Sequence, residues 1–251
     1  MIHVHYRGQL GNNLFQFAFG AVISHLSGQA MAALPITGFP GTSGFARPSA
    51  TSGDRIPRHG YHMNIAEWAE RAKARDIIVH SYPHNSSYYE PHHGWLAPLL
   101  APAPGDYAQA DNDEIVLHLR LGDYFSSHRN RNRFGYPVEA IFKLVAQLDY
   151  KRCLIVTDTP RHQAVERLVR EHCGLLVASN RDHDYRTLFH ARRLIMSPST
   201  FSWWAAWSGH ATEIYFPREM GYWQSKYNCA LAISRPNFRR YNAEGKVLLE
   251  S

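Results

Sequence analysis

The second half of the chain alternates short apolar runs with segments in which apolar residues recur at helical spacing, and this alternation limits the folds available to it. The runs expected to be strands are Glu114–Leu119, Cys153–Thr157, Leu175–Ala178, Leu194–Met196 and Glu213–Phe216. The helices expected between them are Val138–Leu148, Arg161–Glu171, Tyr185–Arg192 and Phe201–Ser208. Alternating strands and helices imply right-handed crossovers and a mostly parallel sheet. The sequence therefore predicts an α/β fold.

The first half of the chain predicts another strand and helix pair at its start. Ile2–Tyr6 alternates apolar and polar residues, and after a glycine-containing turn the apolar residues recur at helical spacing from Leu14 to His25. A helix over Asn64–Ala74 and a strand over Ile77–His80 follow later. Between them, Ala33–Gly60 is rich in Pro, Gly, Ser and Thr, and we expect an irregular surface segment there.

The stretch Ala101–Ala110, rich in Pro, Ala and Gly, is typical of an interdomain linker. A chain of 251 residues with 45% hydrophobic content can form one large domain or two small ones. We expect two domains, residues 1–105 and residues 111–251.

Net charge and cysteine content leave several classes of binding partner open. The net charge of +6 suits nucleic acid, an anionic membrane surface or a phosphorylated substrate. Three widely spaced cysteines indicate neither a disulfide framework nor a zinc site, which favours a reducing compartment. With no apolar signal region and no run of about 20 apolar residues, we expect a cytoplasmic protein, soluble or peripheral at the inner face of the membrane.

The segment His118-Leu-Arg-Leu-Gly-Asp-Tyr124 directly follows the apolar run Ile115–Leu117, so it lies where a buried strand ends in a loop. Ligands of α/β proteins bind at this edge of the sheet. Arg120 offers a permanent charge and a planar fork of donors, which suits a diphosphate better than a neutral ligand.

A second candidate anion site begins at Ser197, just after the strand Leu194–Met196. Ser199 or Thr200 is placed to cap the following helix, and a helix N-terminus with hydroxyl groups favours an anion. The alternative is an ordinary cap before a core helix whose tryptophans are Trp203, Trp204 and Trp207. Because Arg120 and this helix start lie at strand ends of one sheet, we expect them to hold the two halves of a diphosphate.

Two aspartates and one glycine turn complete the set of candidates. Asp158 ends a strand and is placed to accept hydrogen bonds from ribose hydroxyls or guanine. Asp184 has the same potential, although it is equally suited to be a helix N-cap. In Gly8-Gln-Leu-Gly-Asn-Asn13, Gly11 lets backbone approach a ligand, while the alternative is a tight turn with Asn12 in a left-handed conformation.

Other polar clusters have simpler interpretations. The group His80, His84, His92 and His93 has no carboxylate or cysteine at metal-ligand spacing, so a polar groove or a solvated loop is favoured over a metal. The basic run Arg129, Arg131 and Arg133 suits an anionic acceptor or membrane, or simply a solvated face.

Three segments in order resemble the bacterial α-1,2-fucosyltransferases and their α-1,6 relatives. The turn beginning at Gly8 is similar to the family's Gly-Gly-Leu-Gly-Asn-Gln-Leu-Phe-Gln opening, and His118–Tyr124 resembles its His-x-Arg-Arg-Gly-Asp-Tyr motif. Ser197–Trp207 is similar to its Asn-Ser-(Ser/Thr)-Phe-Ser-Trp-Trp-(Gly/Ala)-Ala-Trp motif. Shorter matches occur at Tyr82–His93 and at Asp184–Leu188.

The resemblance implies a GT-B architecture, with two Rossmann-like domains facing across a cleft: residues 1–105 on the acceptor side and residues 111–251 binding GDP-fucose. It implies inverting, metal-independent transfer of fucose to a glycan hydroxyl, expected to be a galactose 2-OH, without a cofactor. Arg120 would hold the β-phosphate. The other expected substrate contacts are Gly11, Asn12, His118, Asp158, Asp184, Ser199, Thr200 and Phe201.

Departures from the family pattern leave alternatives open. Leu121 replaces the motif's second arginine, Asn13 a glutamine, and Pro198 an Asn or Ser. The rival functions are therefore an α-1,6 linkage or another sugar nucleotide, and more distantly a non-catalytic nucleic-acid or nucleotide-binding module, although the core spacing of the tryptophans argues against nucleic acid. Asp123 is the nearest carboxylate to Arg120, and it serves either as the general base or as a brace for that arginine.

Overall fold

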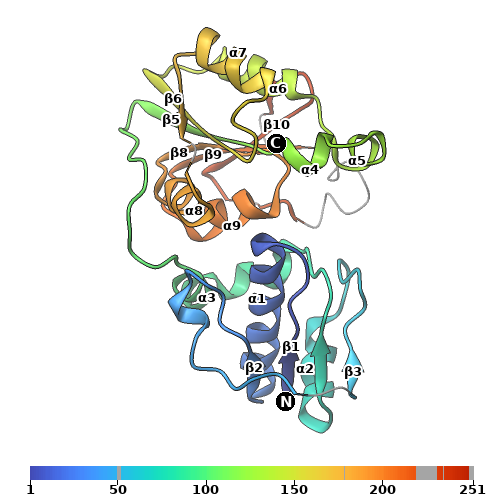
Figure 1. The fold of residues 1–251 in the computed structure, drawn as a ribbon. Coiled ribbons are helices and arrows are strands. Elements are labelled where there is room, and N and C mark those ends of the chain that lie inside the picture. The colour runs from blue at the N-terminus through green and yellow to red at the C-terminus, as the bar shows by residue number, and fades with distance from the viewer. Residues whose placement is uncertain (50–51, 178, 219–230, 234, 249–251) are drawn as a thin grey trace. The chain divides into compact units, whose positions relative to one another are not determined.

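A computed structural model describes residues 1–49, 52–177, 179–218, 231–233 and 235–248 of the chain (Figure 1). It divides into two compact units. The first comprises Met1–Ala103 and a short segment near Ala232, and the second begins at Pro104. Ser86 Oγ donates a hydrogen bond to the carbonyl of Ala232, which ties that returning segment to the first unit. Cys153 is a buried free thiol and Cys173 an exposed one, while Cys229 lies outside the described residues.

The first unit contains a parallel four-stranded sheet in the order β2-β1-β4-β3. Its strands are β1 (Ile2–Val4), β2 (Met31–Ala33), β3 (Asp54–Arg55) and β4 (Ile77–Val79). Its α-helices are α1 (Leu10–Ser27), α2 (Ile65–Ala74) and α3 (His93–Leu99), with 3-10 turns η1 (Pro40–Thr42), η2 (Ser86–Tyr88) and η3 (Glu90–His92). The predicted α/β pattern of this unit is confirmed.

Local chemistry sets the ends of the helices in this unit. Gly8 takes a φ of 84°, which L side chains rarely adopt, and the chain enters α1 two residues later. Gly28 ends α1 in the left-handed conformation at φ 69°. The Asn64 side chain accepts a hydrogen bond from the Glu67 amide and so caps the start of α2, where the sequence predicts a helix.

The second unit contains a seven-stranded sheet in the order β11-β10-β9-β8-β5-β6-β7, in which β10–β11 is the antiparallel pair of the described strands. The strands are β5 (Glu114–Leu119), β6 (Arg152–Thr157), β7 (Gly174–Val177), β8 (Arg193–Ile195), β9 (Glu213–Pro217), β10 (Phe238–Tyr241) and β11 (Val247–Leu248). From β5, the next strands β6 and β7 lie on one side, and β8, β9 and β10 lie on the other side of β5. This is the doubly wound order, and its direction reverses between β5 and β8.

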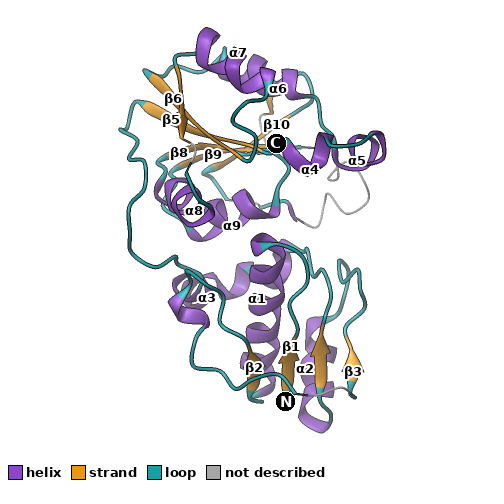
Figure 2. Cartoon of the chain, in the orientation of Figure 1, coloured by secondary structure: helices purple, strands orange, loops and turns teal. Residues whose placement is uncertain are grey.

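Helices cover both faces of this sheet (Figure 2). On one face lie α6 (Val138–Val145) and α7 (Gln163–Glu171), and on the other α8 (Arg181–His190) and α9 (Thr200–Ser208). Trp203, Trp204 and Trp207 are at most 1% exposed, which confirms their predicted place in the core. No described helix is long and apolar enough to cross a membrane.

Several elements differ from the sequence prediction. The loop expected after Leu119 contains two short helices, α4 (Gly122–Phe125) and α5 (His128–Phe134), which carry no apolar stripe that would reveal them. The prediction that α8 begins at Tyr185 is wrong, because the Asn180 side chain caps the helix by accepting from the amides of residues 182 and 183. Strands β10 and β11 were not expected, since short and partly exposed strands give a weak pattern.

Candidate functional site

The predicted anion-binding residues lie at the carboxyl ends of β5 and β8, the two strands between which the sheet reverses its order. At such a reversal the neighbouring loops leave toward opposite faces of the sheet, which opens a place for a ligand. Arg120 directly follows β5, and Ser197 follows β8 by two residues. The backbone amide of Arg120 donates to Ser197 Oγ at 3.1 Å, so the structure brings these two loops together as predicted.

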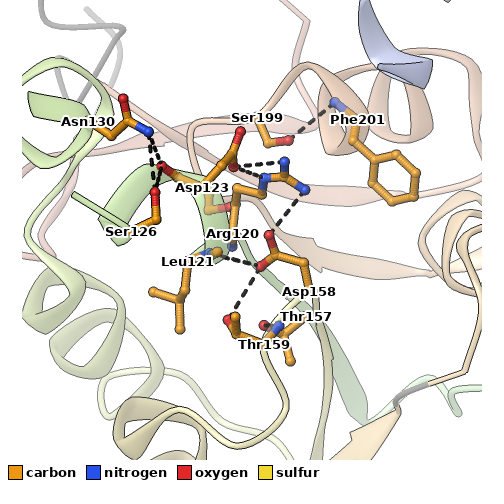
Figure 3. Close-up of polar contacts among 12 residues, drawn as sticks. Arg120, Leu121, Asp123, Ser126, Asn130, Thr157, Asp158, Thr159, Ser199 and Phe201 are labelled. Carbon is orange, nitrogen blue, oxygen red and sulfur yellow. Dashed lines mark hydrogen bonds and ion pairs between the residues drawn. The ribbon is translucent and has the colours of Figure 1, made fainter. Parts of the chain in front are cut away.

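The Arg120 guanidinium is held between two carboxylates (Figure 3). Its Nε and Nη2 lie 3.0 Å and 2.8 Å from Asp123 Oδ1, and its Nη1 lies 3.2 Å from Asp158 Oδ2. The side chain of Arg120 is 18% exposed, compared with 55% for Asp123 and 26% for Asp158. The guanidinium is therefore fixed in direction while part of it reaches solvent, as a preorganised anion-binding group requires.

Asp158 also holds the backbone of the next turn. Its Oδ1 accepts hydrogen bonds from the amides of Leu121 at 3.0 Å and Gly122 at 3.1 Å, at the start of α4. A Cβ added to Gly122 would collide with Asp158 Oδ2, so the absence of a side chain there lets the carboxylate approach. That Asp158 accepts a hydrogen bond from a nucleoside stays a prediction, and in this structure both of its oxygens position the Arg120 loop.

Asp123 makes contacts that fit a bracing role. Its carbonyl accepts hydrogen bonds from Asn130 Nδ2 at 2.8 Å and Ser126 Oγ at 3.1 Å, which link α4 to α5 (Figure 3). Its carboxylate contacts Arg120 as described above. The brace predicted for Asp123 is thus present in the structure, and its role as general base stays a prediction.

Leu121 points away from this polar site. Its side chain is 1% exposed and belongs to the apolar core that includes Leu119, Tyr136 and Ile141. The leucine that replaces the second arginine of the family motif is therefore a core residue of this protein. The Arg120 carbonyl on the same turn accepts a hydrogen bond from the Tyr136 hydroxyl at 2.9 Å, a partner that the sequence did not reveal.

His118 lies beneath the site as a neutral side chain. Side chains alternate along a strand, so His118 faces away from the cluster that holds Leu117 and Leu119 and toward the face covered by α9. Its Nδ1 lies 3.2 Å from Ser197 Oγ, and its ring lies 5.6 Å from that of Phe201. Burial, reinforced by repulsion from the Arg120 charge, lowers the pKa of His118 to about 3. The imidazole is therefore uncharged at neutral pH.

The start of α9 forms the other side of the site. Ser199 Oγ accepts a hydrogen bond from the Phe201 amide at 3.3 Å, which confirms the predicted N-cap. Thr200 and Phe201 are half-buried in the first turn, whereas Ser197, Ser199 and Ser202 are buried. The positive end of the helix dipole thus lies beside the Arg120 loop.

Asp184 lies within α8 rather than before it, so the alternative interpretation of Asp184 as an N-cap is wrong. It is half-buried, and its Oδ1 lies 3.7 Å from His183 Nδ1 without a hydrogen-bond partner among the described residues. Burial raises the pKa of this carboxyl. A buried carboxylate oxygen with an unfilled hydrogen-bonding position is suited to accept from a ligand N–H.

Gly11 and Asn12 belong to the first unit, where they lie in the first turn of α1. The alternative of a left-handed Asn12 is therefore wrong, and Gly8 takes the positive φ instead. Asn12 Oδ1 lies 3.1 Å from Nε2 of His84, and a Cβ at Gly8 would collide with Asn12 Nδ2. Burial lowers the pKa of His84 to about 3.

The remaining predicted clusters fall outside this arrangement. Arg129 and Arg131 lie in α5 and are exposed, as expected of a solvated face. His92 packs against the rings of His25 and Trp95. In the part of the chain that the structure describes, no group of three His, Cys, Asp or Glu side chains is placed to hold a metal ion.

No protein-family model matches this chain, and no curated protein matches it in sequence. Among solved structures, the chain is similar to an α-1,6-fucosyltransferase NodZ soaked with GDP-fucose, with a TM-score of 0.48 and 11% identity over 85% of this chain and 93% of that chain. A structure of fucosyltransferase NodZ from Bradyrhizobium is similar with a TM-score of 0.46 and 12% identity over 85% of this chain and 94% of that chain.

Proposed function

We propose that this protein is a glycosyltransferase that moves fucose from GDP-fucose to a glycan hydroxyl, with inversion and without a metal or other cofactor. The observation that carries the proposal is the Arg120 guanidinium, fixed between Asp123 and Asp158 at the reversal point of a doubly wound sheet. The motifs around Gly8, Arg120 and Ser199 support the choice of sugar and nucleotide. The expected arrangement is GT-B, with the first unit on the acceptor side.

The chemistry requires stabilisation of a departing diphosphate. As the bond from the sugar to the β-phosphate breaks, negative charge builds on the phosphate oxygens and positive charge on the sugar ring. A guanidinium whose direction is already fixed, together with the N-terminus of α9, would stabilise that charge more in the transition state than in the ground state. One such donor is typically worth about 3 kcal/mol.

The two carboxylates around Arg120 differ in how firmly other contacts hold them. Asp158 is tied to the amides of Leu121 and Gly122 as well as to the guanidinium, whereas Asp123 is more than half exposed. A bound β-phosphate would therefore displace Asp123 from Arg120 and leave Asp158 in place. The displaced Asp123 carboxylate would then be free to accept the proton of the acceptor hydroxyl as general base.

The nucleoside would be recognised on the α8 side of the site. The half-buried Asp184 carboxylate suits the ring N–H and amino groups that distinguish guanine from other bases. Neutral His118 and the ring of Phe201 would contact the nucleoside, with Ser199 and Thr200 contacting phosphate. Gly11 and Asn12 would reach the donor from the first unit. The acceptor is expected to be a galactoside 2-OH, and an α-1,6 linkage is the alternative.

Calorimetric titration of GDP, UDP and a short oligonucleotide tests the donor class. GDP should bind more tightly than UDP, and Arg120→Ala should weaken GDP binding by at least tenfold. Arg170→Ala is the matched control, since Arg170 is an exposed arginine on α7. Absence of GDP binding, or binding of the oligonucleotide that Arg120→Ala leaves intact, would contradict the proposal.

Product analysis tests the reaction. Labelled GDP-fucose and a panel of galactosides should give a fucosylated product whose linkage is read by NMR, with the same rate in the presence of a chelator. A requirement for a divalent metal ion would refute the metal-independent mechanism.

A further inference from the structure

Strands β1 and β4 are the two central strands of the parallel sheet in the first unit. Strand β2 lies on one side of this pair, and β3 lies on the other. The loops that leave the carboxyl ends of these strands are residues 5–9 and 80–89, and the loop after β3, residues 56–64, lies next to them. The carboxyl ends of parallel strands share this edge, and ligands of open α/β sheets bind outside it.

These three loops contain many basic residues and no acidic one. Arg7, Arg58 and five histidines lie in them, but no Asp or Glu does. Neither Arg7 nor Arg58 forms an ion pair with a described carboxylate, whereas Arg71 and Lys73 of the same unit pair with Glu67 and Glu70. Cations left unbalanced on one edge of a small unit mark a surface for an anion.

The charges gather around His80 at the end of β4. Burial is the first cause that lowers the pKa of His80, and repulsion from neighbouring cations is the second. The groups that act on His80 are Arg7, His5, Arg55 and Arg58, of which the three arginines carry a permanent charge. Their positive potentials therefore overlap at one place.

A buried glutamine holds the loops in position. Gln16 of α1 is fully buried, and its Oε1 accepts from the Arg7 amide at 2.8 Å. Its Nε2 donates to the carbonyls of Arg7 at 3.2 Å and Ser81 at 2.8 Å. The amide of Tyr82 donates to the Arg58 carbonyl at 2.9 Å. The backbones that carry both arginines are thus anchored, which reduces the entropy lost on binding.

Aromatic rings lie among the same cations. His59 stacks on Tyr61 with ring centroids 5.6 Å apart and on Tyr82 with centroids 6.4 Å apart. The guanidinium carbon of Arg7 lies 5.9 Å from the centre of the Tyr82 ring. Flat rings beside charged forks offer an apolar surface for the C–H face of a sugar and donors for a group attached to it.

We infer that this surface, the basic–aromatic edge formed by Arg7, Arg58, His59, His80 and Tyr82, binds an acidic sugar of the acceptor glycan. The inference rests on the proposed function and specifies its acceptor as an anionic glycan. The anion is a carboxylate or a sulfate ester, since a guanidinium binds both through the same fork. Tyr82 and His59 contact the sugar ring, and Arg7 and Arg58 bind its charged group.

The test uses the full chain and three oligosaccharides of equal length. These are a tetragalacturonate, a neutral galactotetraose and a sulfated galactotetraose, each titrated by calorimetry in the presence of GDP. At least one acidic oligosaccharide should bind about tenfold more tightly than the neutral one, and added salt should weaken that binding. The two acidic ligands together show which anion is preferred.

Variants locate the binding. Arg58→Gln and Arg7→Gln should each weaken binding of the acidic oligosaccharide by roughly threefold to tenfold, because each removes one charge-assisted contact near solvent. Arg71→Gln, an exposed arginine on α2, should change it less than twofold. In turnover assays Arg58→Gln should raise KM for an acidic acceptor and leave kcat unchanged.

The outcomes separate this inference from the proposed function. If GDP binds but all three oligosaccharides bind equally, or the variants have no effect, the acidic acceptor is refuted and the transferase proposal stands. If phosphatidylserine vesicles bind through Arg7 and Arg58 while no oligosaccharide does, the edge is a membrane surface and the inference is overturned. If GDP fails to bind to the unaltered chain, the proposed function fails first.

Discussion

The substitution Gly122→Ala tests whether Asp158 controls the direction of Arg120. It removes no charge and no hydrogen-bonding group. The added methyl would collide with Asp158 Oδ2, the oxygen that pairs with the Arg120 guanidinium. The carboxylate must therefore move, and the arginine loses one of its two fixed partners.

The magnitude follows from the bonds that Asp158 makes. It accepts from the amides of Leu121 and Gly122 at 3.0 Å and 3.1 Å and lies 3.2 Å from Arg120 Nη1. A hydrogen bond to a charged group contributes about 1.5 to 3 kcal/mol. Displacement strains these bonds without abolishing all of them, so we expect a loss of about 2 kcal/mol in the free energy of unfolding. A misdirected Arg120 should cost about 1.4 kcal/mol in GDP binding, which is tenfold in affinity.

Urea unfolding measures the stability, and calorimetry measures GDP affinity. Gly94→Ala is the matched control, because Gly94 lies inside α3 with open space around its Cα and should gain about 0.5 to 1 kcal/mol from helix propensity. GDP affinity within twofold of the unaltered chain, despite lost stability, would show that Asp158 does not position a nucleotide-binding Arg120. Unchanged stability and affinity together would refute the described geometry itself.

Three further predictions concern single side chains. Leu121→Arg should lower the free energy of unfolding by more than about 3 kcal/mol, because it places a charge in the core, and urea unfolding that shows a smaller loss would contradict the burial of Leu121. Burial lowers the pKa values of His84 and His118 to about 3, so only the unfolded chain takes up protons at these histidines between pH 6.5 and 3. The stability contribution of each neutral histidine is therefore full above pH 6.5, and the free energy of unfolding of each unit should be about 2 kcal/mol lower at pH 5 than at pH 7. Urea unfolding at both pH values measures this difference, and equal free energies would contradict the burial of the two histidines. Ser199→Ala should cost about 1 kcal/mol by removing the cap on α9, and equal unfolding midpoints would exclude that cap as a source of stability.

The elements of the fold were predictable where the hydrophobic pattern of a segment matches its burial in the folded protein. Strand β5 occupies Glu114–Leu119 as predicted, because its centre, Ile115–Leu117, is the continuous apolar run typical of a buried strand in a parallel sheet. The helix at Asn64–Ala74 was predictable from its cap and its spacing. Helices α4 and α5 were not, because both are short, and the start of α4 is held by hydrogen bonds to Asp158, which is distant in the sequence.

The candidate site was predictable in outline for a similar reason. The carboxyl ends of parallel strands share one edge, so Arg120 and Ser199 were expected together even though they are far apart in the sequence. Their local partners were not expected. Ser197 contacts the Arg120 amide across a separation of 77 residues, and the link from Tyr136 to the Arg120 carbonyl depends on where the chain returns after α5.

Arg120 and Leu121 are neighbours on one turn, but the Arg120 side chain lies in the polar site and the Leu121 side chain lies in the core. Arg120 points toward solvent between two carboxylates, and Leu121 points into the core, so the turn supplies one positive charge against two negative ones. A diphosphate approaching this turn would be repelled by the net negative charge, and displacement of Asp123 would leave the charges of Arg120 and Asp158 balanced. Most of the remaining attraction must then come from the N-terminus of α9, whose dipole is not neutralised by an acidic residue in its first turn. In the proposed function, nucleotide binding and the release of Asp123 would therefore be one coupled step, and the candidate base would be free only when a donor is bound.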